Sequence, residues 1–109
     1  MAAPVSHFVN VEQIPWIQRH PGVLWKVIWE APEGFPKALL VRIEPGTTSP
    51  RHRHLGDEHL FVLEGSLGDD AGVCEAGNYV RRPAGCVHTV FSTRGGLAFS
   101  LVTAASEYF

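Results

Sequence analysis

The sequence lacks a long hydrophobic run and an export signal. No apolar stretch among its 109 residues approaches the roughly 20 residues that a membrane-spanning helix requires, so none is predicted. The first residues, MAAPVSHFVNVEQ, have neither the basic start nor the apolar centre of a signal peptide. Cysteine is scarce too: without an export signal, Cys74 and Cys86 are expected to be free thiols in a reducing compartment. These absences predict a cytoplasmic protein with no membrane partner.

An excess of one charge is also missing. The formal net charge is -2, and the nine lysine and arginine residues are spread thinly, which argues against a nucleic-acid partner. Two local pairs, Arg51 with Arg53 and Arg81 with Arg82, are expected on the solvated surface. A length of 109 residues suits a single domain. We expect an N-terminal arm over 1–22, a barrel over 23–103 and a tail over 104–109.

Helical periodicity is absent, whereas short strand-like segments are frequent. No stretch of ten residues shows a convincing period of 3.6, and turns rich in glycine and proline separate the apolar segments. Segments 24–30 and 37–44 each place three apolar side chains on one face of a strand. These are Trp25, Val27 and Trp29 in the first and Leu39, Val41 and Ile43 in the second. Further strands are predicted at 51–55, 59–64, 73–74, 79–82, 87–91 and 97–103. We therefore predict an all-β sandwich or barrel with little or no helix.

Four residues could form a metal site. His52 and His54 stand two apart, so on a strand both imidazoles point to one face, while the arginines beside them point to the other. Glu58 can supply a carboxylate oxygen, and His88 can approach from a distant strand when a barrel closes. A lone His-x-His pair is more often a surface or core pair than a ligand set. The glycines, proline and further residues that surround the histidines at set spacings argue against a surface or core pair here.

The pattern resembles the two motifs of the cupin family, G-x5-H-x-H-x3-E-x6-G and G-x5-P-x-G-x2-H-x3-N. Ser92 is the one departure, at a position that is not a ligand. The resemblance implies a cupin jelly-roll barrel, a double-stranded β-helix, that binds one divalent metal ion per chain. Fe, Zn, Ni and Mn are all compatible with the four ligands. The matching positions are Gly46, His52, His54, Glu58 and Gly65 in the first motif and Gly77, Pro83, Gly85 and His88 in the second.

The surrounding residues are most similar to the ChrR-type cupins, over roughly residues 15–103. That group includes the metal-binding domain of certain anti-sigma factors and single-domain dioxygenases. An anti-sigma factor would also need a helical sigma-binding domain, and we expect none here because only about twenty residues precede the barrel. Family likeness also implies a homodimer. The matching residues are His54, Gly56, Glu58, Val62–Gly65, Asp69, Asp70, Ala76, Gly77, Tyr79, Arg81, Pro83, Gly85 and His88.

Two functions follow from the resemblance. The chain could be a metal-dependent dioxygenase of the Fe(II) type that acts on a small ketone, diketone or aromatic ketone. Alternatively, it could be a non-catalytic zinc-binding cupin with a sensing, regulatory or small-ligand-binding role. Both give it a small-molecule substrate or ligand. The sequence leaves the choice between enzyme and binding protein open.

Several residues near the motifs could contact the ligands or the substrate. The candidates are His59, Cys86, Tyr79, Phe61, Phe91, Trp25 and Trp29. Each has a plainer alternative: a packed or exposed histidine, an inert buried thiol, or core packing. Phe61, Leu63, Val90 and Phe91 are expected to line the barrel. Arg42 and Arg82 could bind a substrate carboxylate if they point inward, whereas His7 and His20 are expected on the surface.

Overall fold

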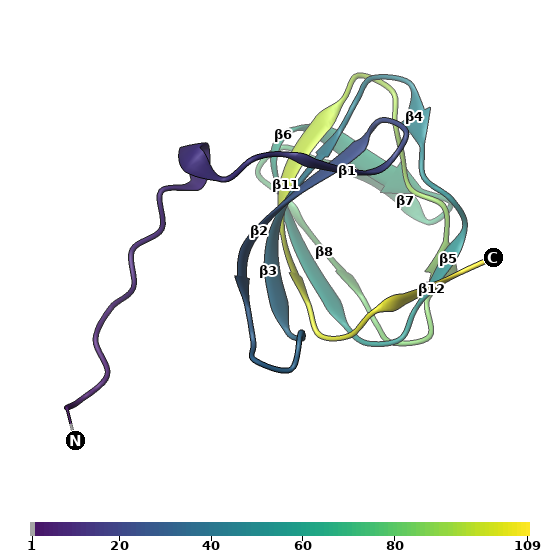
Figure 1. The fold of residues 1–109 in the computed structure, drawn as a ribbon. Coiled ribbons are helices and arrows are strands. Elements are labelled where there is room, and N and C mark those ends of the chain that lie inside the picture. Colours follow the sequence, from purple (N-terminus) through teal and green to yellow (C-terminus); the bar gives the residue numbers. More distant parts are fainter. Residues whose placement is uncertain (1) are drawn as a thin grey trace.

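The computed structural model describes residues 2–109 and consists almost entirely of β-strands (Figure 1). Within these residues the only helical segment is the 3-10 turn η1 (Val11–Gln13), which confirms the all-β prediction. No helix in the same range is long and apolar enough to cross a bilayer. The strands are β1 (Ile17–His20), β2 (Val23–Glu30), β3 (Lys37–Ile43), β4 (Thr47–Thr48), β5 (His52–His54), β6 (Glu58–Asp69), β7 (Gly72–Glu75), β8 (Tyr79–Arg82), β9 (Val87–His88), β10 (Phe91–Ser92), β11 (Gly96–Val102) and β12 (Ser106–Tyr108).

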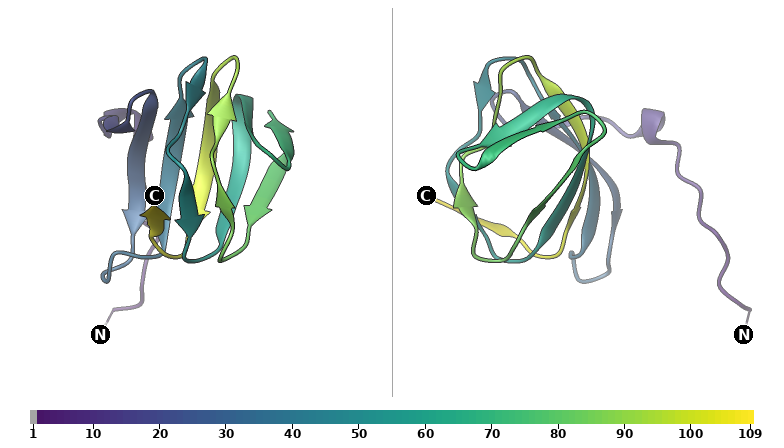
Figure 2. Two further views of the ribbon diagram at one scale, coloured as in Figure 1. Left: turned by 90° about the vertical axis from the view of Figure 1, so that its right-hand side faces the viewer. Right: turned by 180° about the vertical axis from the view of Figure 1, so that it is seen from behind.

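The strands curl around one interior. In hydrogen-bonded order the larger sheet runs β1-β2-β3-β11-β6-β10-β4, with β7 and β8 also paired to β6. A second sheet has the order β12-β5-β9. Figures 1 and 2 show this small sheet across the barrel from β2 and β3. The barrel therefore has one large wall and one short wall, and the histidines of β5 and β9 belong to the short wall.

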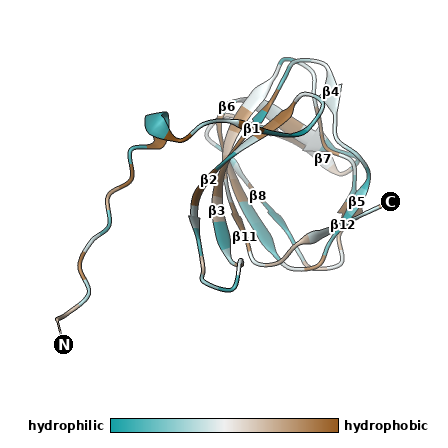
Figure 3. Ribbon diagram, viewed as in Figure 1, coloured by the Kyte–Doolittle hydropathy of each residue, from teal (hydrophilic) through white to brown (hydrophobic). Residues whose placement is uncertain are grey.

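The hydrophobic core covers the inner face of the large wall. Leu39, Val41 and Ile43 of β3 are buried, which confirms the face predicted from their spacing. In the register of the sheet, Val41 pairs with Ala98 and Ala98 pairs with Val62, and the last two are fully buried. Figure 3 shows hydrophobic residues along β2 and hydrophilic residues along β8. Leu60, Leu67 and Val90 complete the cluster.

Two predicted lining residues of β6 face solvent instead. Phe61 and Leu63 are 43% and 44% exposed, whereas Leu60 and Val62 are buried. The reason is the period of two: β6 begins with the inward-facing Glu58, so the even-numbered residues of this part of the strand follow it to the inside. Placing Glu58 in the barrel already required the odd-numbered side chains to point outward.

A bulge separates the tryptophans of β2. Val27 pairs with Leu39, but Trp29 pairs with Ala38, so two steps along β2 match one step along β3. The extra residue reverses the side-chain alternation. Trp25 remains on the inner side and is half-buried, while Trp29 is 50% exposed. The expectation that the two tryptophans share a face is therefore wrong.

Both ends of the chain contribute strands that the sequence pattern did not suggest. β1 lies within the expected N-terminal arm and pairs with β2, and β12 lies within the expected tail and pairs with β5. Residues 5–9 of the expected arm have no regular structure, and Figure 1 shows this segment extending away from the barrel. Pairing with β5 places Tyr108 opposite His52, so the C-terminal strand is part of the wall that carries the histidines.

Candidate metal centre

Strand pairing brings three histidines together. In β5, His52 and His54 are buried while Arg53 between them is exposed, as the spacing predicted. Arg53 pairs with Glu107 on the outside at 2.8 Å. β5 is antiparallel to β9, and His52 lies directly opposite His88. The structure thus brings His88 to the His-x-His pair through the β5–β9 ladder.

The three Nε2 atoms converge. Nε2 of His88 lies 2.8 Å from Nε2 of His54 and 3.1 Å from Nε2 of His52. Donor atoms from the three side chains all lie within 4.8 Å of one another, and the side chains are buried. Imidazole nitrogens facing one another at this separation suit a shared metal ion, because each can direct a lone pair to it.

Hydrogen bonds on the far side of two rings assign the tautomers. Nδ1 of His52 lies 2.8 Å from the carbonyl oxygen of Pro50, which can only accept, so Nδ1 carries the hydrogen. Nδ1 of His88 lies 2.7 Å from Oδ2 of Asp69 and 3.2 Å from Nε of Arg82. The shorter contact is to the carboxylate, whose pKa is lowered and which accepts, so this Nδ1 is assigned the hydrogen. Both rings therefore direct a bare Nε2 into the cluster. Two lone pairs facing each other at 3.1 Å fit a cation between them, so the donor set suits a divalent metal.

Burial favours the neutral form of His54 and His88. It lowers the pKa of His54 to about 4, against an opposing effect of the nearby Glu58. Burial also lowers the pKa of His88, although the hydrogen bond to Asp69 acts in the other direction. Uncharged imidazoles are the form that binds metals. The site is therefore ready to accept a cation at neutral pH without losing protons from these rings.

Asp69 also belongs to the site. From the sequence alone, this residue is named only as part of an acidic stretch in the family pattern. It ends β6 and reaches the back of the His88 ring. Burial opposes its ionisation, but hydrogen bonds from His88 and the Ala71 amide, together with Arg82, hold its pKa below the ordinary value. A carboxylate on the remote nitrogen of a metal-binding histidine fixes the ring and increases its basicity.

Glu58 lies beside the histidines but is engaged elsewhere. Its Oε1 is 4.0 Å from Nε2 of His54 and 3.1 Å from Nη1 of Arg82. Its Oε2 accepts a hydrogen bond from the Ser100 hydroxyl at 2.8 Å. Within residues 2–109 the donor atoms that meet within 4.8 Å belong to the histidines alone. The structure thus brings Glu58 to the edge of the cluster and not into it.

Arg82 is buried in the barrel, contrary to the expected solvated pair with Arg81. Arg82 is 3% exposed, whereas Arg81 is exposed and pairs with Asp57 at 3.0 Å. The reason is the β6–β8 register, which places Arg82 opposite the inward-facing Glu58. Nε of Arg82 also lies 3.6 Å from Oδ2 of Asp69. One guanidinium therefore holds both carboxylates that flank the histidines.

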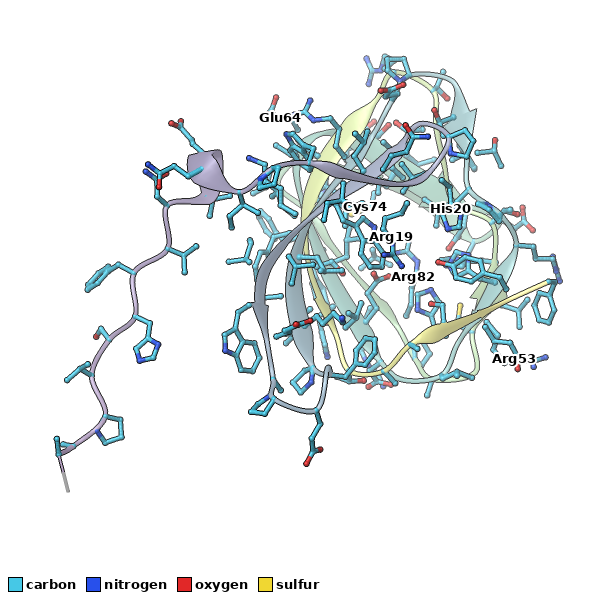
Figure 4. The ribbon with its side chains drawn as sticks, in the orientation of Figure 1. Arg19, His20, Arg53, Glu64, Cys74 and Arg82 are labelled. Atoms are coloured by element: carbon cyan, nitrogen blue, oxygen red, sulfur yellow. The ribbon has the colours of Figure 1, made fainter. Side chains whose placement is uncertain are left out.

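A cavity of about 230 Å³ adjoins the histidines. Its walls are largely aliphatic side chains of the core, and Trp25, Glu58 and Arg82 also line it. Arg19, His20 and Tyr108 line it as well, and Figure 4 shows Arg19, His20 and Arg82 in the opening of the barrel. His20 was expected on the surface but is half-buried, with its ring centroid 4.9 Å from that of Tyr108. Burial, then Arg19 and His52, lower the pKa of His20.

Most of the other candidate pocket residues lie away from this cavity. Nδ1 of His59 is 2.6 Å from the Tyr79 hydroxyl, because both residues lie at outward-facing positions of β6 and β8. Cys86 lies in the turn before β9, outside the cavity lining, and both cysteines are free thiols as expected. Phe91 is half-buried and packs near Gly68. Arg42 is exposed, with its guanidinium 5.0 Å from the centroid of a Trp16 ring. Of the aromatic candidates, only Trp25 lines the cavity.

Comparison with known proteins yields one family and several structures. A family model described as the ChrR Cupin-like domain matches residues 5–105. An RmlC-like cupin from Ralstonia eutropha is 23% identical, with a TM-score of 0.86 over 96% of this chain and 73% of that one. An acetylacetone dioxygenase from Acinetobacter johnsonii is 14% identical, with a TM-score of 0.86 over 100% and 81%.

A third similar structure is a chain of the complex between Rhodobacter sphaeroides SigE and the anti-sigma ChrR. It is 24% identical, with a TM-score of 0.74 over 85% of this chain and 51% of that one. No curated protein sequence matches. At these identities the structural likenesses speak for the fold, and they confirm the jelly-roll barrel expected from the two motifs.

Proposed function

Because the chain belongs to the family of ChrR cupin-like domains, we propose that it binds one divalent metal ion and uses it on a small molecule. His52, His54 and His88 are the proposed ligands. The observation that carries the proposal is the convergence of their Nε2 atoms, two of which present lone pairs 3.1 Å apart. Nε2 of His54 lies 2.8 Å from that of His88, so the third ring meets the other two at the same point.

Glu58 is the proposed fourth ligand. Two donors that each lie about 2.1 Å from an ion can be at most about 4.2 Å apart. Oε1 of Glu58 is 4.0 Å from Nε2 of His54 and therefore meets this limit for one of the three histidines. Arg82 and Ser100 hold the same carboxylate, so its share in binding the ion competes with these two partners.

The ligand pocket supports an enzyme that acts on a small ketone, diketone or aromatic ketone. A divalent ion at this place would supply Lewis acidity to a bound oxygen atom. Aliphatic residues such as Val27, Leu39 and Val90 line the cavity and would limit the access of water to a bound ligand. A cavity of about 230 Å³ suits a small molecule rather than a drug-sized one. We therefore place the chain among metal-dependent oxygenases of the Fe(II) type.

A non-catalytic zinc protein is the second candidate. Three imidazoles and one carboxylate can close a tetrahedral site, which leaves no open position for a substrate. The match to the family model of ChrR cupin-like domains supports a sensing or regulatory role of this kind. In that case the cavity would hold a ligand without turning it over.

Metal analysis followed by oxygen uptake separates the two functions. The protein is purified without added metal, its metal content is measured, and a portion is reconstituted with Fe(II). The oxygenase proposal expects stoichiometric iron and oxygen uptake with acetylacetone or a dihydroxyacetophenone. Zinc alone, with no uptake even after iron reconstitution, would establish the second candidate and overturn the first. His54→Ala protein serves as the control for uptake that does not depend on the site.

A further inference from the structure

The cavity mouth carries a cation next to the proposed metal site. Arg19 comes from β1 and lines the same cavity as the three histidines, and Figure 4 shows it in the barrel opening near Arg82. Its guanidinium carbon lies 4.5 Å from the centroid of a Trp25 ring. Stacking on this ring gives the guanidinium a preferred position beside the apolar wall.

A bulge explains how Arg19 reaches the cavity. Gln18 pairs with Leu24, but His20 pairs with Val23, so the register of β1 shifts around Arg19. In a regular strand, neighbouring residues point to opposite faces, whereas Arg19 and His20 both line the cavity. The irregularity of β1 thus adds a cationic side chain to the mouth that a regular strand would turn outward.

Arg19 differs from the other cations of the cavity in having no acidic partner. Arg82 pairs with Glu58 at 3.1 Å, and Lys37 pairs with Glu30 at 3.0 Å. No carboxylate of residues 2–109 lies within ion-pair distance of Arg19. A bound ligand is therefore free to supply the negative charge.

Tyr108 adds a hydroxyl group to the lining of the same cavity. Tyr108 lies on β12, and its ring centroid is 4.9 Å from that of His20 and 5.4 Å from that of His52. The ring extends the apolar wall toward the histidines, and its hydroxyl can donate a hydrogen bond. The cavity thus presents a guanidinium, a phenol, apolar walls and the three histidines to one ligand.

We propose that Arg19 binds the carboxylate of the ligand, so that the substrates are small keto-carboxylates rather than neutral ketones. This inference rests on the proposed function, because it places the keto oxygen at the metal end of the cavity. The guanidinium fork matches a carboxylate with two parallel hydrogen bonds, which a neutral methyl ketone cannot accept. The apolar walls accommodate the short carbon chain between the two groups.

A matched pair of probes tests the inference. Acetoacetate and acetylacetone share one skeleton and differ in whether one end is a carboxylate or an acetyl group. Their Kd values are measured by calorimetry on zinc-loaded protein, so that turnover does not interfere. We expect acetoacetate to bind at least about tenfold more tightly than acetylacetone. R19Q should remove that preference, R19K should restore part of it, and acetylacetone should bind all variants alike.

R42Q is the matched control, since Arg42 stacks on Trp16 but lies outside the cavity. It should bind both probes like the wild type. Equal Kd values for the two probes on the wild type, including no binding of either, would overturn the inference. So would an R19Q protein that keeps the preference for acetoacetate. The metal content of the same samples reports separately on the proposed metal site, so loss of the preference with full metal content refutes the carboxylate site alone.

Discussion

Asp69 and His88 form a hydrogen-bonded pair, with Oδ2 of the carboxylate 2.7 Å from Nδ1 of the imidazole. The contact points the other ring nitrogen of His88 at His52 and His54. Arg82 holds the same carboxylate at 3.6 Å and pairs with Glu58 as well. The Asp69 carboxylate therefore orients one proposed ligand, His88, through its outer ring nitrogen and does not itself contact the proposed ion.

Removal of this support should weaken metal binding. Asp69→Asn keeps the shape of the side chain but takes away the charge that orients His88, and we predict a roughly 10- to 100-fold loss of Zn(II) affinity. Competition with a chromophoric chelator measures the change. Asp70→Asn is the control, because Asp70 is adjacent and exposed. Equal affinities of the Asp69 and Asp70 variants would show that the contact has no influence on the site.

The buried guanidinium should be necessary for stability. Arg82→Met leaves Glu58 and Asp69 without their common partner inside the barrel, which should lower the free energy of unfolding by about 3 kcal/mol or more. Arg81→Met breaks only an exposed pair with Asp57 and should cost about 0–1 kcal/mol. Urea unfolding of the two variants gives both values. Similar losses would mean that Arg82 acts as a surface residue.

The metal-free protein should lose stability on mild acidification. The pKa of His54 is about 4 in the folded chain, below its ordinary value of 6.5, so between these two pH values the unfolded chain binds more protons. Stability is therefore fully present above pH 6.5 and falls as the pH is lowered toward 4. At pH 5 the loss from this group is about 2 kcal/mol relative to pH 7.

His54→Gln removes the titrating group and serves as the comparison for that pH dependence. Its urea midpoint should fall less than that of the wild type between pH 7 and pH 5, in the presence of a chelator. A wild-type midpoint that does not change over this range would contradict the buried neutral state of His54.

The chain is predicted to form a homodimer, and the outer face of the large sheet is the proposed contact. Phe61, Leu63 and Phe99 are 43%, 44% and 39% exposed, and Phe61 and Phe99 are paired across β6 and β11. Exposed apolar side chains that gather on one face are typical of contact surfaces. Sedimentation equilibrium should give the mass of two chains for the wild type and of one chain for the F61E/F99E variant. A wild-type mass of one chain would refute the dimer.

Local sequence rules were enough for the His-x-His pair and the core of β3. Both depend on a period of two within one strand, and this period holds wherever the strand is regular. The family motifs added His88, whose position depends on the pairing of β5 with β9. The bulge at Val27–Trp29 does not alter the pattern of apolar residues, so the period of two predicted the wrong face for Trp29.

The side-chain positions that the sequence does not determine are those fixed by long-range register. Arg82 turns inward because β8 pairs with β6 so that Glu58 is its partner, and Asp69 reaches His88 from the far end of β6. Arg19 and Tyr108 join the cavity through a bulge in β1 and through the pairing of the last strand with β5. None of these contacts has a local signal, apart from the acidic pair at Asp69 and Asp70 in the family pattern.

The proposed metal centre is tested most directly by the metal content of four proteins. The wild type and the His52→Ala, His54→Ala and His88→Ala variants are purified without added metal, reconstituted with one divalent metal, desalted and analysed by plasma mass spectrometry. We predict about one equivalent per wild-type chain and about a tenth or less in each variant, because each histidine supplies one of the converging Nε2 atoms. A wild type that retains no metal would contradict the proposal, and so would full retention in any one of the variants.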